Sequence, residues 1–191
     1  MTELDSLCAE LTCGDDERAE KAAGCFPEFG AAGLQALRRL IKAQNADERW
    51  WAVRAMAGFE IGTTIDLLEA LQDKSSDVRQ ASAMAFCHHP DPRAVLPLVQ
   101  VLDDPDPMTA RLASNALVQI GADATLALLN VLINGKQSAR LEAVRALAEI
   151  KDTRAIPGLM KALETDSALM QYWAGLGLDK LGVGMVYLKP D

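Results

Sequence analysis

Hydrophobic positions recur along this chain with a period of about 31 residues. One column runs Leu40, Leu71, Leu102, Leu132 and Leu163, and another runs Leu37, Leu68, Val99, Leu129 and Met160. Two columns of small residues repeat in phase with them: Gly24, Ala55, Ala85, Ala116 and Ala146, and also Ala52, Ser82, Ala113 and Ala143. Self-similarity at a period of roughly 20–50 residues is typical of repeat architectures. The pattern therefore predicts a stack of similar units.

Each unit of the pattern reads as two helices. An Ala-rich first helix, as over residues 78–87 and 139–150, precedes a second helix with leucines at i, i+3 and i+4 spacing. Small residues let neighbouring helices approach closely, and leucines fill the space between layers. We expect the first helices to begin at Asp16, Asp47, Asp77 and Ser138. Met108 interrupts this column of helix-start residues, and Asp106 and Pro107 just before it can start the helix instead. Asp91 and Asp152 are predicted N-caps of second helices.

The ends of the chain differ from its middle. Residues 1–14 predict a capping helix that begins with a capping box from Thr2 to Asp5. Residues 15–165 contain five repeats. Residues 166–191 contain a half repeat, which has the first helix of a hairpin but no second one, and an apolar tail that packs on the last repeat or on a partner. We expect one elongated core and a single solenoid domain over residues 1–191.

The repeat resembles the HEAT repeat, in the short variety first described in phycobilisome lyases. The motif is carried by Asp16-Glu17-Arg18, Asp47-Glu48-Arg49, Asp77-Val78-Arg79 and Ser138-Ala139-Arg140, and the second helix by Asp91-Pro92-Arg93-Ala94. The resemblance implies an all-α fold: a right-handed α-α superhelix, a HEAT-like solenoid of about five helical hairpins plus terminal capping helices. It also implies a structural ladder through Arg18, Arg49, Arg79 and Arg140. The third full repeat departs from the motif, because Ala110 holds the register and Arg111 follows it.

Composition narrows the classes of partner. Half of the residues are apolar, and the net charge is −8. This negative charge opposes binding to a polyanion such as nucleic acid. The sequence has no uninterrupted run of 18 apolar residues and no signal-peptide pattern, so we expect no membrane contact. Four cysteines without a C-x-x-C pair fit free thiols in a reducing cytoplasm.

The second helices offer a candidate binding surface, because they usually line the concave face of such a solenoid. Their outward positions form two rows: Arg38, Glu69, Gln100, Asn130 and Lys161, and Gln35, Asp66, Pro97, Ala127 and Gly158. The predicted partner-binding residues are Gln35, Arg38, Asp66, Glu69, Gln100, Asn130, Lys161 and Trp50. The alternative is that these are ordinary solvated positions.

Trp50 is included because adjacent helical residues cannot both face the core, so either Trp50 or Trp51 should be exposed or semi-exposed and could serve as an interface anchor. Alternatively, one indole lies in the core and the other lies flat over Arg54 or a neighbouring loop.

No set of catalytic or metal-ligating residues emerges from the spacing. Cys87-His88-His89 combines ligand types, but adjacent histidines point apart and no fourth ligand is near, so we predict no metal and no cofactor. Serine-histidine-aspartate and phosphate-loop patterns are absent from the sequence, and we therefore predict no enzymatic activity.

The leading functional hypothesis is a non-enzymatic scaffold that binds a protein or peptide on its second helices. The alternative, implied by the resemblance, is a subunit similar to bilin lyases. Its tetrapyrrole pocket would be lined by Trp50, Tyr172, Trp173 or the thiols. A HEAT-like DNA glycosylase is a third option, which the net charge of −8 opposes.

Overall fold

The computed structural model describes residues 2–183, which form helices and turns without a strand. The chain divides into two compact units, residues 1–89 and residues 90–191. Unit 1 contains α1 (Glu3–Leu11), α2 (Asp16–Cys25), η1 (Phe26–Phe29), α3 (Gly30–Leu40), α4 (Ala46–Met56), α5 (Thr64–Ala70) and α6 (Ser76–His88). Unit 2 contains η2 (Pro92–Ala94), α7 (Val95–Val101), α8 (Pro107–Ile120), η3 (Gly121–Ala124), α9 (Thr125–Asn134), α10 (Gln137–Ile150), η4 (Thr153–Ala155), α11 (Ile156–Thr165) and α12 (Ala168–Lys180).

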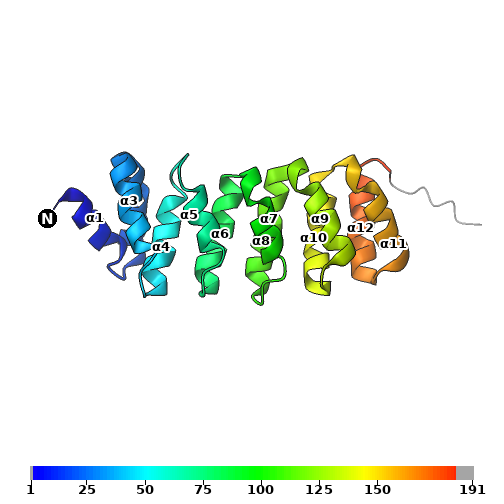
Figure 1. The fold of residues 1–191 in the computed structure, drawn as a ribbon, viewed down its shortest axis with the longest axis horizontal. Helices are drawn as coiled ribbons and strands as arrows, with labels where there is room; N and C mark the ends of the chain where they lie inside the picture. The colour runs from blue at the N-terminus through cyan, green and yellow to red at the C-terminus, as the bar shows by residue number, and fades with distance from the viewer. Residues whose placement is uncertain (1, 184–191) are drawn as a thin grey trace, which may run out of the picture. The chain divides into compact units, whose positions relative to one another are not determined.

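Within each unit the helices lie side by side in chain order, as Figure 1 shows by colour. First helices pack on first helices of the next repeat, as α4 does on α6 and α8 on α10. Each also packs against neighbouring second helices, as α10 does against α9. The predicted all-α helical repeat is confirmed.

The columns of small residues lie where helices meet. Ala52, Ser82, Ala113 and Ala143 are all fully buried. The hydroxyl of Ser82 donates to the carbonyl oxygen of Leu67 at 2.6 Å, which satisfies the column's polar member. In the other column, Ala55, Ala85, Ala116 and Ala146 are also buried. Gly24 of that column is the exception, because it is exposed and no atom of another element lies within 4 Å of where its Cβ would stand. Helices therefore approach closely along this seam except at its N-terminal end.

The last helix continues the close approach between layers. A Cβ on Gly177 of α12 would stand 2.9 Å from the Cα of Ala148 in α10, closer than side chains tolerate. Ala174, one turn earlier, is fully buried. The tail that follows, apart from Gly182 and Val183, lies outside the described residues.

Helix starts agree with the sequence in some repeats and differ in others. The capping box of Thr2 and Asp5 is present, with two hydrogen bonds of 2.8 and 3.1 Å. The side chains of Asp91 and Asp152 cap η2 and η4, the short turns that lead into α7 and α11, and Asp106 caps α8.

Helix α2 begins at Asp16, as predicted, whereas α4 and α6 begin at Ala46 and Ser76, one residue before Asp47 and Asp77. The actual N-caps are Asp15, Asn45 and Ser75, so Asp16, Asp47 and Asp77 lie inside the first turn. The last predicted start differs in the same direction, because Lys136 occupies the N-cap of α10 and Ser138 lies inside the helix. An acidic residue is favourable at both places, next to the positive end of the helix dipole, so composition alone does not separate them.

The stretch Pro107–Asn134 is long and apolar enough to span a membrane by length and composition alone. In the structure it is not one straight helix, because Gly121, with a φ of 78°, ends α8 and a short turn leads into α9. Both helices pack against α7 and α10, and the stretch therefore folds as part of the repeat.

Candidate functional site

The predicted binding rows are largely exposed, but two of their members are bound to each other. Nε of Arg38 donates to both carboxylate oxygens of Asp66 at 3.0 Å, and Nη2 donates to the carbonyl oxygen of Gly62 at 3.1 Å. Hydrogen bonding to Asp66 raises the pKa of Arg38. Gln35, Glu69, Gln100, Asn130 and Lys161 are exposed, whereas the row members Pro97, Ala127 and Gly158 are half-buried. Their role in binding stays a prediction.

Another column on the second helices is apolar and exposed, and it is not among the predicted binding residues. Ile65, Leu96 and Leu126 have 66, 68 and 62% of their surface exposed. They repeat at the same spacing as the leucine columns, so the periodicity itself is the available signal. Periodicity does not separate exposed from buried columns, because roughly half of a protein's accessible surface is apolar.

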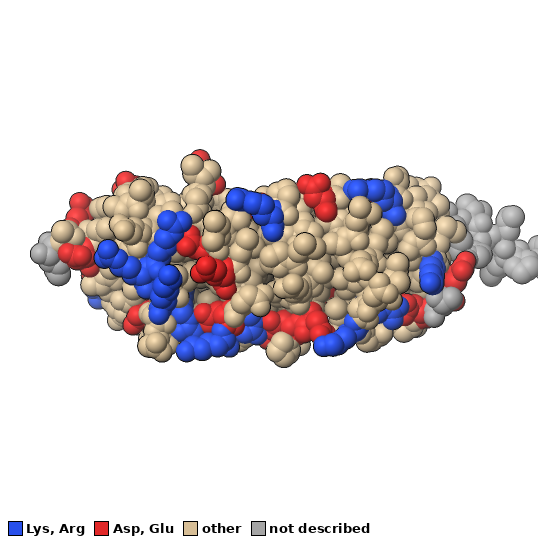
Figure 2. All heavy atoms as spheres, viewed as in Figure 1, with Lys and Arg blue, Asp and Glu red and all other residues tan. Residues whose placement is uncertain are grey.

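Within unit 2, further exposed apolar side chains lie along α9 and α11. Leu126 and Ile133 are seven residues apart on one face of α9, and both are more than half exposed. Met160 on α11 is exposed as well. Figure 2 shows that where α7 to α11 lie, charged side chains stand mainly along the margins of the visible face. A continuous uncharged area remains between them.

A cavity of about 290 Å³ lies between α9 and α11 at one end of these helices. Leu132, Ile133 and Pro157 form part of its apolar wall. Two cations, Arg140 and Lys161, also line it, together with one carboxylate, that of Asp166. The cavity therefore combines an apolar wall with a small excess of positive charge.

A larger cavity of about 530 Å³ lies in unit 1 between α2 and α4. Trp50 and Trp51 line it and meet edge to face, with ring centroids 4.7 Å apart. Both indoles are half-buried. The prediction asked for at least one exposed or semi-exposed indole, and both meet it. The alternative with one indole wholly in the core is wrong, because neither Trp50 nor Trp51 is fully buried. The role of Trp50 as an interface anchor stays a prediction.

The second aromatic pair lies on α12 and lines neither of these two cavities. Tyr172 is exposed, and Trp173 stands edge to face with it at 5.4 Å. The guanidinium of Arg145 lies 4.8 Å from the centre of the Trp173 ring, a cation–π contact. Trp173 borders a small hollow of about 30 Å³, close to the volume that one water needs. These rings do not share a pocket with Trp50.

Two of the four thiols, those of Cys87 and Cys8, are poorly placed as nucleophiles or ligands. Burial raises the pKa of Cys87 to about 11, and burial also raises the pKa of Cys8. A ring nitrogen of His89, Nε2, lies 2.8 Å from the carbonyl oxygen of Ala57 and makes a structural contact there. No cluster of three His, Cys, Asp or Glu side chains able to hold a metal ion occurs among residues 2–183.

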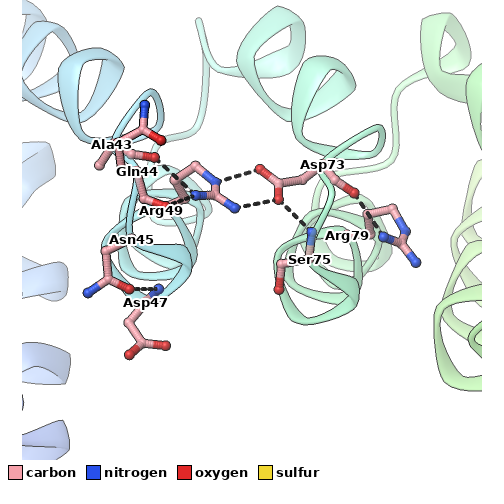
Figure 3. A network of polar contacts seen from close by, with 8 residues as sticks. All are labelled: Ala43, Gln44, Asn45, Asp47, Arg49, Asp73, Ser75 and Arg79. Carbon is pink, nitrogen blue, oxygen red and sulfur yellow. Dashed lines mark hydrogen bonds and ion pairs between the residues drawn. The ribbon is translucent and has the colours of Figure 1, made fainter.

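The ladder arginines make different contacts in different repeats. Figure 3 shows Arg49 between two inter-repeat loops: it donates to both carboxylate oxygens of Asp73 at 2.7 and 2.8 Å, and to the carbonyl oxygens of Ala43 and Gln44 at 3.0 and 2.9 Å. Arg79 donates to the carbonyl oxygen of Asp73 at 2.8 Å.

The remaining members of this column show how the contact varies. Arg140 pairs with Asp166 and donates to the carbonyl oxygen of Leu132, whereas Arg18 pairs with Glu10 in α1. In the repeat that departs from the motif, Arg111 forms a two-pronged pair with Glu142 at 2.9 and 3.0 Å. A displaced arginine therefore finds a carboxylate on the first helix of the next repeat.

The fold and the two family matches define the class of this protein. HEAT repeats match residues 64–135, and the PBS lyase HEAT-like repeat matches residues 139–165. The chain is a HEAT-repeat protein of the type found in phycobilisome lyases.

Two named relatives make the comparison more particular. The chain is 33% identical over 105 residues to a phycobilisome maturation protein of Synechococcus elongatus, over 55% of this chain and 50% of the relative. It is 38% identical over 78 residues to the phycocyanobilin lyase subunit beta of a Nostoc species, over 41% of this chain and 39% of the relative. The matches therefore span half or less of these relatives' length.

Solved structures share the fold. The complex of CpcE and CpcF of phycocyanin lyase from Nostoc sp. PCC7120 matches with a TM-score of 0.55 at 20% identity, covering 95% of this chain and 78% of that one. A designed armadillo repeat protein matches with a TM-score of 0.53 at 20% identity, covering 94% of this chain and 100% of that one. At this identity the likeness shows the fold alone.

These findings correct two predictions. The leading hypothesis of a non-enzymatic scaffold is wrong, and so is the expectation of no enzymatic activity: the relatives are named as a lyase subunit and a maturation protein, and they favour the bilin-lyase alternative. The residue spacing offered no catalytic motif from which a lyase could have been predicted. A repeat protein and a lyase-subunit complex do support a protein partner, and the described residues form a helical repeat.

Proposed function

We propose that this chain is a lyase-type subunit that handles a bilin, an open-chain tetrapyrrole, in concert with a protein partner. The observation that carries the proposal is the 38% identity to a phycocyanobilin lyase subunit. The free cysteines in the described part of the chain are compatible with the reducing cytoplasm, where we propose that it works.

The surface of α9 and α11 in unit 2 is the proposed bilin site. A bilin has a long apolar conjugated system and carries carboxylate side chains, so it needs apolar contact area next to positive charge. Ile133 and Pro157 offer such area at the cavity, and Lys161 and Arg140 offer the charge. Arg140 pairs with Asp166 and supports the fold, whereas Lys161 is exposed, so Lys161 is the better test of the ionic contact.

The cavity between α2 and α4 is a poorer bilin site in spite of its tryptophans. Four carboxylates line it, those of Asp16, Glu20, Asp47 and Glu48. They would repel the carboxylates of a bilin. The surroundings of Trp50 therefore favour a different kind of ligand, and the thiols line neither cavity.

The test adds phycocyanobilin to the purified chain and follows the visible absorbance and the induced circular dichroism. We expect a saturable spectral change that weakens in Lys161→Glu and in Ile133→Ser. Matched controls are Lys42→Glu and Ile61→Ser, which alter exposed residues of the same types in unit 1. The absence of any spectral change would overturn the bilin proposal, and an equal loss in the controls would overturn the location of the site.

A further inference from the structure

The cavity between α2 and α4 is lined by two indoles and by four carboxylates, which we call its rim: Asp16, Glu20, Asp47 and Glu48. Its volume of about 530 Å³ lies within the range of roughly 300–1,000 Å³ that small-ligand pockets have. Trp50 and Trp51 offer aromatic surface that is half-buried, and the T-shaped pair holds the two rings in different planes. An aromatic wall in a pocket of this size is large enough for a side chain of a partner.

The charge of the rim is unbalanced. Among the four carboxylates, Glu20 has a partner, because it pairs with Arg54. Within residues 2–183, Asp16, Asp47 and Glu48 make no ion pair, and Figure 3 shows the carboxylate of Asp47 pointing away from the arginine network. Among the described residues no cation lines the cavity, and the two arginines of α4, Arg49 and Arg54, are already paired. Net negative charge therefore stands beside the indoles.

Helix dipoles account for part of this arrangement. Asp16 lies in the first turn of α2, and Asp47 and Glu48 lie in the first turn of α4, where negative charge is favourable. The dipole does not account for Glu20, which lies in the second turn, or for the two indoles that share the cavity. Together these groups match a ligand that is both cationic and flat.

We propose that this cavity receives an arginine side chain of a protein partner. A guanidinium is planar, stacks on aromatic faces and donates in a fork that matches carboxylates. A lysine ammonium lacks the planar surface, and a bilin carboxylate has the wrong sign. The site lies on the first helices of unit 1, so it does not depend on the bilin site of unit 2.

The experiment titrates the full chain carrying Trp173→Phe, which leaves Trp50 and Trp51 as its only tryptophans, and follows indole fluorescence. The probe is the capped peptide acetyl-Arg-Gly-Arg-amide. Its matched control contains citrulline, a neutral residue of the same shape, in place of arginine. Calcium chloride alone is the third arm, because an acidic rim also attracts a divalent cation.

Two variants separate the rim from a general effect on helix ends. Asp47→Asn removes a rim carboxylate, and Asp77→Asn removes the carboxylate at the same place in the first turn of α6. Both should lose the same small helix-dipole stabilisation, so thermal unfolding by circular dichroism should match between them.

We expect saturable binding of the arginine peptide below about 1 mM, weaker binding of the citrulline peptide, and a loss of about three- to tenfold in Asp47→Asn but not in Asp77→Asn. The proposal would be overturned by equal binding of the two peptides, by equal effects of the two variants, or by no saturation with arginine. A saturable response to calcium chloride that blocks the peptide would instead identify a metal site and also overturn it.

Discussion

Arg49 and Arg18 occupy the same position of the repeat motif but lie in opposite environments. Arg49 is 5% exposed at its side chain and binds Asp73, which is 12% exposed, together with two backbone carbonyls. Arg18 is 56% exposed and binds Glu10, which is 41% exposed. Both pairs are two-pronged with similar distances of 2.6 to 2.8 Å. The difference teaches that the motif specifies a contact, whereas burial decides what the contact contributes.

The physical reason lies in what each group has around it when its partner is removed. An exposed carboxylate regains water, so an exposed pair contributes little. A buried carboxylate regains nothing, and removing its partner leaves an uncompensated charge in the protein. Arg49 in addition holds two loop carbonyls, of Ala43 and Gln44, that would need new donors.

The largest expected effect is that of Arg49→Ala. It should lower the free energy of unfolding by about 3–5 kcal/mol, because Asp73 loses its ion-pair partner and keeps only the Ser75 backbone donor, while two carbonyls lose a donor at the same time. Urea denaturation followed by circular dichroism measures this change. Adding Asp73→Asn to the variant should recover part of the loss, since the unpaired charge is then gone. A loss as small as that of an exposed pair would show that water reaches this site.

A smaller effect should appear when acid removes the charge of Asp73 instead. Burial by itself would raise the pKa of Asp73, but hydrogen bonds from Arg49 and from the backbone nitrogen of Ser75 outweigh it and lower the pKa. A lowered pKa in the folded state gives stability that is present above the ordinary value of about 3.9 and is lost as pH falls through the folded value.

The difference in unfolding free energy between the wild type and Arg49→Ala should therefore shrink as pH falls below about 4. Taking the difference between two proteins cancels the acid response of the other carboxylates. Urea titrations at a series of pH values measure it. A difference that stays constant down to the acid-unfolding region would show that the loss comes from the loop carbonyls and not from Asp73.

The smallest expected effect is that of Arg18→Ala. Its pair with Glu10 is exposed, so the melting temperature should stay unchanged within error at physiological salt. Differential scanning calorimetry is a suitable measurement. A clear destabilisation would mean that α1 is held to α2 mainly by this pair. The exposed pair of Arg18 would then contribute to stability as the buried pair of Arg49 does.

The same lesson applies to the candidate sites. The spacing of Ile65, Leu96 and Leu126 is visible in the sequence, but a period does not say which side of a helix meets a neighbour. The sequence places Arg38 and Asp66 in outward rows, but only the folded chain shows that these two side chains bind each other. The cavity beside Trp50 could not be predicted, because it needs residues from α2, α4 and the loops before them in one place.

The sequence by itself determined the helical repeat of this protein, its period, its small-residue seams at positions such as Ala52 and Ala143, and its membership of the HEAT-repeat class. These follow from local periodicity, which every unit of the chain carries on its own. Only the tertiary structure decided which arginines are buried and which apolar columns stay exposed. It alone also placed four carboxylates and two indoles in one cavity. Those properties belong to residues far apart in the sequence, such as Arg49 and Asp73 at a separation of 24 positions, and only the packing of helices brings such residues together.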